Sequence, residues 1–112
     1  MSTGHYELQK VRNGHFLFHL KGNNGETILH SETFSSKASA ENAITFARYV
    51  APDETNYELK QNNDDAAYFV LRGKNQQIIG HSDPYNSLKA AKQGIRAAMA
   101  LAITLEIKDM TH

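Results

Sequence analysis

The chain of 112 residues carries 12 Lys and Arg against 12 Asp and Glu, six His, and neither Cys nor Trp. A chain of this length can bury enough surface to fold as one globular domain without a disulfide or a structural metal. The lack of Cys excludes disulfides, thiolate zinc sites, iron–sulfur clusters and cysteine nucleophiles. Zero net charge argues against a protein whose main task is bulk electrostatic binding of DNA or of an anionic membrane.

The start of the chain and its most apolar stretch are both unlike membrane-targeting segments. Residues 1–6 lack a basic region followed by an apolar run, so they do not resemble a secretory signal. The stretch from Ala97 to Leu105 has nine residues, far fewer than the roughly 20 that cross a bilayer. We therefore expect a cytoplasmic protein without a membrane partner.

Two copies of one unit follow each other along the chain. A shift of 51 positions places Tyr6-Glu7-Leu8 on Tyr57-Glu58-Leu59, and His30-Ser31 on His81-Ser82, without a gap. Fifteen of the 46 positions from Tyr6 to Ala51 are then identical, far more than chance gives. We expect a single domain, residues 1–112, made of two repeats at approximately 5–54 and 55–108 and forming a monomer with internal pseudo-twofold symmetry.

Three strands are predicted at the start of the first repeat. Tyr6 to Val11 is a short strand, and the period-two spacing of apolar residues from Phe16 to Leu20 predicts a second one. The segment Gly22 to Gly25 is a strong hairpin signal because Asn and Gly tolerate positive φ. A third strand is predicted from Glu26 to Thr33.

One helix follows the strands in each repeat. The apolar spacing changes to three and four residues, which is typical of a single helical stripe. This stripe runs from Ala40 to Ala51 and, in the second repeat, from Ala91 to Ala102. Small residues dominate it, so we expect each helix to lie close to a sheet, with Gly94 at the closest approach.

A further strand is predicted after each helix. Ile103 to Ile107 alternates apolar with polar residues, and its counterpart from Pro52 to Asn56 would merge with the opening strand of the second repeat. Each repeat is then β-β-β-α-β. The predicted fold is α+β, with one largely antiparallel sheet of seven or eight strands and both helices packed on one face.

Several segments of the chain resemble one known family. They are the hairpin from Phe16 to Leu29, the stretch Phe34-Ser35-Ser36-Lys37, the segment Asn75 to Gly80 and the closing Ile107-Lys108-Asp109. Together they are similar to the YegP-like small bacterial proteins, and the resemblance covers almost the whole chain. It implies tandem β-β-β-α-β units that share one sheet and exchange their C-terminal strands, and other members are single units that pair as dimers. It implies no activity, because the family is uncharacterised and has no accepted catalytic motif.

His30 and His81 are candidate binding residues because the duplication places them at equivalent points near a pseudo-twofold axis. A three-residue hairpin loop would set Phe18 opposite His30, and a slip of one residue would turn the imidazole to the other face. We favour half-buried packing histidines, with a binding groove and a metal site as the alternatives.

The tripeptides His30-Ser31-Glu32 and His81-Ser82-Asp83 combine the residue types of a hydrolase. Adjacent strand residues point to opposite faces, so this spacing does not assemble a triad. The acidic pairs Asp53-Glu54 and Asp64-Asp65 suit a divalent cation, but the second matches a turn of the first repeat, and we favour a solvated loop. We expect no catalytic site, no metal and no cofactor.

Two groups on the predicted helices are further candidates. Lys89, Lys92 and Arg96 are spaced by three and four residues, which places them on one face of the second helix as a basic stripe. Phe46 and Tyr49 lie off the apolar stripe of the first helix, at positions where the second repeat has alanines. They mark either a partner surface or a cover for the edge of the sheet.

The leading hypothesis for function is a non-enzymatic interaction module that holds a protein or a small ligand on the open sheet face or its edges. The alternative is a weak nucleic-acid-binding protein that uses the basic stripe, with Lys21, Arg72 and Lys74 contributing.

Overall fold

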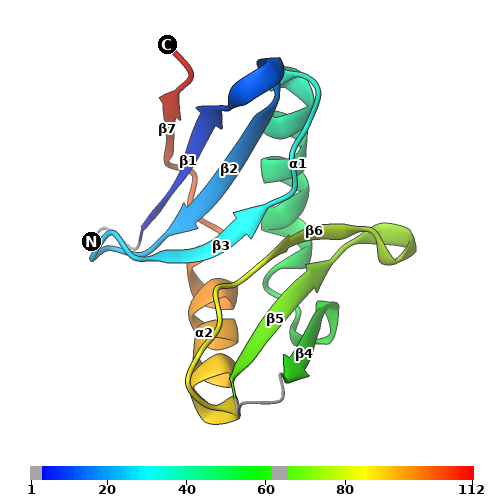
Figure 1. The fold of residues 1–112 in the computed structure, drawn as a ribbon, viewed down its shortest axis with the longest axis vertical. Helices are drawn as coiled ribbons and strands as arrows, with labels where there is room; N and C mark the ends of the chain where they lie inside the picture. Colours follow the sequence, from blue (N-terminus) through cyan, green and yellow to red (C-terminus); the bar gives the residue numbers. More distant parts are fainter. Residues whose placement is uncertain (1–3, 62–65) are drawn as a thin grey trace.

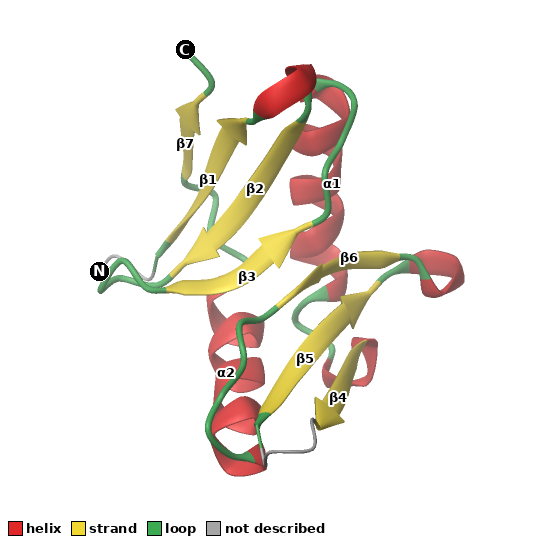
Figure 2. Cartoon of the chain, in the orientation of Figure 1, coloured by secondary structure: helices red, strands yellow, loops and turns green. Residues whose placement is uncertain are grey.

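The computed structural model describes residues 4–61 and 66–112, so the pair Asp64-Asp65 lies outside the described residues. This part of the chain forms seven strands and two helices (Figures 1 and 2). The helices are α1 (Lys37–Val50) and α2 (Leu88–Leu101). The strands are β1 (His5–Lys10), β2 (Phe16–Lys21), β3 (Thr27–Ser31), β4 (Tyr57–Gln61), β5 (Ala67–Arg72), β6 (Ile78–His81) and β7 (Ile107–Met110).

The strands form one sheet in the order β4-β5-β6-β3-β2-β1-β7. Neighbouring strands are antiparallel except for β1 and β7, which are parallel. Both helices lie behind this sheet in Figure 1, α1 against β1 and β2, and α2 against β3, β4 and β5. The predicted α+β fold, with a largely antiparallel sheet and two helices on one face, is therefore confirmed. Within the described residues, neither helix is long and apolar enough to span a membrane.

The two repeats meet at the centre of the sheet, where β3 pairs with β6. His30 lies directly opposite His81 in this antiparallel pair, which places the pseudo-twofold axis between them. The helices start at equivalent positions, and each has a serine N-cap: Ser36 accepts a hydrogen bond from the Ser39 N–H, and Ser87 makes the same bond in the second half.

The same set of aromatic contacts recurs in the core of each half. An edge-to-face pair has ring centroids 5.7 Å apart in the first half and 5.5 Å apart in the second, and a stacked pair follows at 6.3 Å in both. The rings belong to Tyr6, Phe18 and Phe34, and to Tyr57, Phe69 and Tyr85.

Two tyrosine hydroxyls tie the halves together. Tyr6 donates to the carbonyl of Ala102 at 2.7 Å, and Tyr57 donates to the carbonyl of Ala51 at the same distance. Each bond runs from the opening strand of one half to the end of the other half's helix. Burial raises the pKa of both tyrosines above the ordinary value, so both hydroxyls remain protonated donors. These reciprocal bonds link the two repeats in addition to the sheet that they share.

The predicted bounds of the strands after the helices are wrong. Residues 52–56, expected as a strand, contain a turn and the 3-10 turn Glu54–Asn56, because Asp53 caps the Thr55 N–H. The strand expected from Ile103 to Ile107 starts only at its last residue, because a turn at residues 102–103 follows α2 and residues 104–106 have no regular structure.

The exchange of C-terminal strands is seen at β7, which belongs to the second repeat but pairs with β1 of the first. By the 51-residue offset, β7 corresponds to residues 56–59, most of which lie in β4. The post-helix strand of the first repeat thus merges with the opening strand of the second, as expected. Because β4 pairs with β5 of its own repeat, the exchange runs in one direction only.

Candidate functional site

The residues that the sequence singled out lie in three separate places. The sheet face opposite the helices carries His30 and His81. The outer surface of α2 carries Lys89, Lys92 and Arg96, and α1 carries Phe46 and Tyr49.

His30 and His81 lie side by side, with ring centroids 5.6 Å apart. His19 joins them, with its ring 4.9 Å from that of His30. Phe18 and Leu20, which flank His19, are buried in the core against the helices, so His19 itself points to the open face of the sheet. The structure therefore places three imidazoles together at the pseudo-twofold axis.

A β-bulge explains why His19 joins the cluster. The register of the β2–β3 hairpin shifts between Leu20 and the next residue, and Ile28 is the extra residue. As a result His30 lies opposite His19, and the expected pairing of His30 with Phe18 is wrong.

Two carboxylates lie near these rings. His30 Nε2 is 2.9 Å from Asp83 Oδ1, but the pair lacks the alignment of a hydrogen bond. His81 Nδ1 is 3.9 Å from Glu32 Oε2. Burial, and then the neighbouring His30, lowers the pKa of His19, which favours its neutral form. Among residues 4–61 and 66–112, no three His, Asp or Glu side chains are arranged to hold a metal ion.

The serines beside the histidines have structural roles. Ser31 Oγ accepts from the Phe18 N–H at 2.8 Å and donates to the carbonyl of Glu32 at 2.7 Å. Ser82 makes the equivalent two bonds in the second half. Both serines are buried, and they point away from the histidines along each strand. Neither hydroxyl is therefore placed beside an imidazole base.

The basic stripe is exposed on the outer face of α2. Lys89, Lys92 and Arg96 form no salt bridge with another side chain of the described ranges. Lys21 and Arg72 do not extend this stripe, because they alternate with buried core residues on their strands and so point to the opposite face of the sheet. Lys74 is exposed in the turn Lys74–Gln76 and not on α2, so the basic stripe itself is confined to one helix.

The two aromatic residues of α1 differ in their surroundings. Phe46 lines an apolar groove of about 390 Å³ together with Phe34 and Ile78. Tyr49 is 81% exposed on the outer surface of the helix. Phe46 also lies over Gly73, the residue that follows β5.

The outer edge of β4 is a feature that the sequence did not reveal. β4 lies at one end of the sheet and pairs only with β5 among the described residues. The Phe69 N–H bonds to Ser82 on the β6 side, so the neighbouring Tyr68 and Val70 direct their backbone groups toward β4. Glu58 and Lys60, their partners in β4, direct their own backbone groups toward β5. Leu59 lies between these two residues and therefore directs its N–H and C=O outward.

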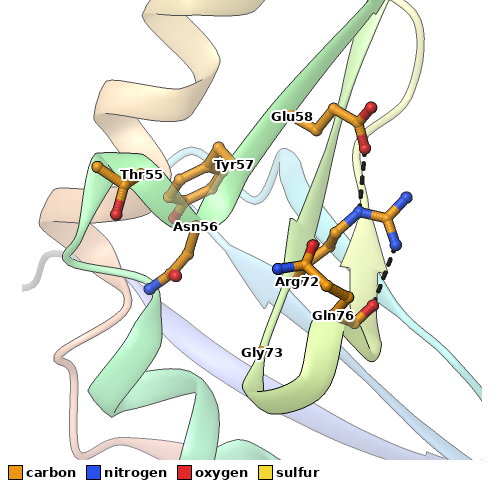
Figure 3. A pocket seen from close by; sticks show the side chains of 7 residues that line it. All are labelled: Thr55, Asn56, Tyr57, Glu58, Arg72, Gly73 and Gln76. Atoms are coloured by element: carbon orange, nitrogen blue, oxygen red, sulfur yellow. Dashed lines mark hydrogen bonds and ion pairs between the residues drawn. The ribbon is translucent and has the colours of Figure 1, made fainter.

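A polar pocket of about 280 Å³ lies where β4 begins (Figure 3). Arg72 crosses it, donating from Nε to Glu58 Oε1 at 3.0 Å and from Nη1 to the Gln76 carbonyl at 3.0 Å. The hydrogen bond from Arg72 lowers the pKa of Glu58, so the pocket wall holds an ionised pair. Its other lining residues are Thr55, Asn56, Tyr57 and Gly73.

In the first half the equivalent edge is filled. Gly4 and Tyr6, the counterparts of Thr55 and Tyr57, both bond the C-terminal segment: the Tyr6 N–H donates to the Glu106 carbonyl at 3.0 Å, and Thr104 Oγ1 donates to the Gly4 carbonyl at 3.1 Å. The pocket in Figure 3 therefore borders the place where the second half has no counterpart of this segment among the described residues.

Comparison with known proteins gives the family of the chain. A family model described as "Domain of unknown function (DUF1508)" matches residues 12–58 and 62–109, one match for each repeat. The chain belongs to the DUF1508 family. The protein is 50% identical over 111 residues to the UPF0339 protein YegP of Yersinia pestis, with 99% of each chain covered. It is 41% identical over 109 residues to YegP of Escherichia coli strain K12, with 97% of this chain and 99% of that relative covered.

Two solved structures of this family share the fold. The solution NMR structure of yegP from E. coli, a protein of unknown function, has a TM-score of 0.92 and 40% identity, covering 99% of this chain and 96% of that one. The solution NMR structure of a UPF0339 protein from Shewanella oneidensis has a TM-score of 0.91 and 41% identity, covering 97% and 92%. The expected family and the tandem architecture are thus confirmed, and the family is uncharacterised.

Proposed function

We propose that this chain is a non-enzymatic interaction module that binds an extended segment of another protein along the outer edge of β4. The observation that carries the proposal is the difference between the two halves. β7 covers the outer edge of β1, whereas no strand of the described chain covers the equivalent edge of β4.

The backbone of β4 offers the groups that strand addition needs. Leu59 presents an N–H and a C=O outward, and Tyr57 presents a C=O, while the Tyr57 N–H is already bonded to Glu54. An added strand gains affinity from main-chain hydrogen bonds and specificity from alternate side chains. The charged side chains of Glu58 and Lys60 lie on the open face, where they limit unspecific pairing without blocking the backbone.

A pull-down with a blocked edge tests this function. Leu59→Pro removes an outward N–H and leaves the pairing with β5 in place, since proline is tolerated on edge strands. Wild-type protein, Leu59→Pro and the control Glu41→Gln, which changes an exposed residue of α1, serve as baits in host extract. We expect a protein that wild type and Glu41→Gln retain and Leu59→Pro loses, and that binds again as a purified component. An identical set of bound proteins on all three baits would contradict the proposal. Fractionation of host cells checks the cytoplasmic location that the proposal includes.

Weak nucleic-acid binding is the second candidate, supported by the three exposed cations of α2 that form no salt bridge within the described ranges. This function predicts an affinity that falls steeply with salt and that is lost when Lys89, Lys92 and Arg96 are all changed to Glu. The absence of an electrophoretic shift at low salt would rule it out. His30, His81, Phe46 and Tyr49 remain proposed contact residues for a protein partner.

A further inference from the structure

The filled edge of the first half shows what a strand on the β4 edge would meet. β7 runs parallel to β1, with Ile107 opposite Tyr6 and Asp109 opposite Leu8. Asp109 lies on the helix side of the sheet, where its carboxylate accepts a hydrogen bond from Lys37 Nζ at 2.6 Å. This bond lowers the pKa of Asp109 well below the ordinary value, so the aspartate remains ionised.

The second half replaces the two cations that hold the C-terminal segment. Lys37, the first residue of α1, corresponds to Leu88, the first residue of α2. Arg48, whose Nε donates to the Thr104 carbonyl at 2.8 Å, corresponds to Met99. Leu88 is 39% exposed, which is high for a leucine on a helix that packs against the sheet. At these two helix positions the second half therefore has apolar side chains where the first half has cations that hold the C-terminal segment.

We propose that the β4 edge accepts a parallel strand of a partner protein that carries an apolar residue at the position equivalent to Asp109, where it contacts Leu88. This inference rests on the proposed function and names the chemistry of its ligand. An aspartate at this position would lose water without gaining a cation, which is unfavourable beside a leucine. A second copy's β7 is accordingly a poor occupant, since it carries Asp109 and already pairs with its own β1.

Two synthetic peptides test the preference. One has the sequence of residues 103–112, and the other is the same peptide with Asp109→Leu. Each is titrated into isotope-labelled full-length protein, and the affected amides are followed by NMR, which detects weak binding. We expect the Asp109→Leu peptide to shift amides of β4, from Tyr57 to Gln61, and to bind about tenfold more tightly than the unchanged peptide.

A change in the protein provides the reciprocal test. Leu88→Lys restores the lysine of the first half, so it should reverse the preference and favour the unchanged peptide. Ala100→Lys, at an exposed position of the same helix, is the matched control and should leave the preference of the wild type intact. Leu88 begins the helix and is partly exposed, so we expect both variants to fold, which their NMR spectra check directly.

The outcomes separate this inference from the proposed function. Equal affinity of the two peptides, no binding of either, or shifts confined to β1 would overturn the inference. A partner lost on Leu59→Pro would still support the proposed function in each of these cases. Conversely, a preference for the Asp109→Leu peptide that Leu88→Lys reverses supports the inference even when the pull-down yields no partner.

Discussion

Gly94 and Tyr85 offer a stability test that uses the duplication as its own reference. In the first half, Ala43 and Phe34 line the groove between α1 and the sheet, and in the second half Gly94 and Tyr85 stand at these positions. A Cβ atom added to Gly94 would overlap the hydroxyl and ring of Tyr85. The phenol oxygen thus occupies space that a methyl group takes in the first half, and the expected close approach at Gly94 is a contact with this side chain.

The size of the effect follows from two opposing contributions. Replacing a helical glycine with alanine stabilises by about 1 kcal/mol. Crowding a packed side chain costs about 1–3 kcal/mol. Gly94→Ala should therefore destabilise the wild type by about 0–2 kcal/mol, because the ring stacked on Phe69 must move. In the Tyr85→Phe background the same change should cost about 1 kcal/mol less, because the overlap with the hydroxyl is removed while the ring must still shift toward the arrangement of Phe34 beside Ala43.

Urea unfolding of four proteins measures this coupling: the wild type, Gly94→Ala, Tyr85→Phe and the double variant. Ala100→Gly is the control at an exposed position of α2, and its effect should be the same with Tyr85 or Phe at position 85. If Gly94→Ala changes the free energy of unfolding by the same amount in both backgrounds, within about 0.5 kcal/mol, the steric reasoning is refuted.

Three further predictions concern the ties between the halves, the histidine cluster and the two sheet edges. Tyr6→Phe leaves the Ala102 carbonyl without its buried donor and should lower the free energy of unfolding, measured in urea, by about 1–3 kcal/mol. A decrease of less than about 0.5 kcal/mol would show that this bond contributes little to stability. The pKa of His19 is lowered in the folded state, so the folded protein binds a proton at this imidazole less readily than the unfolded chain does. The free energy of unfolding should therefore fall as the pH drops below 6.5, and His19→Gln should reduce this dependence on pH. An unchanged pH dependence would contradict the assignment to His19. Leu8→Pro should destabilise the protein more than Leu59→Pro, because only the Leu8 N–H faces a paired strand. A lower melting temperature for Leu59→Pro than for Leu8→Pro would count against an open β4 edge.

Much of the fold could be predicted because each sequence pattern occurs in both repeats. The alternation in β2 and the helical stripe of α1 recur 51 residues later, so a pattern present in only one repeat could be set aside as chance. The bulge at Ile28 could not be predicted, because one extra residue leaves no signal in composition or spacing. That bulge decides which face His30 occupies, and so the cluster with His19 emerged only from the structure.

The β4 edge was missed for a different reason. Sheet order depends on pairings between strands far apart in the chain, such as β1 with β7, and periodicity does not report them. A signal was nevertheless present in the repeat alignment. Lys37 and Arg48 align with Leu88 and Met99, and such a loss of two cations at equivalent positions marks a contact that only one half makes.

Amide hydrogen exchange of the free protein tests the central claim most directly, because Leu8 and Leu59 are equivalent residues on a covered and an uncovered edge. The Tyr6 N–H bonds to the β7 side, and the parallel ladder continues at Leu8, whereas the Leu59 N–H faces no strand of the described chain. We predict that the Leu59 amide exchanges at least about tenfold faster than the Leu8 amide. Equal protection of the two amides would mean that the β4 edge is covered, and would contradict its role as the binding site.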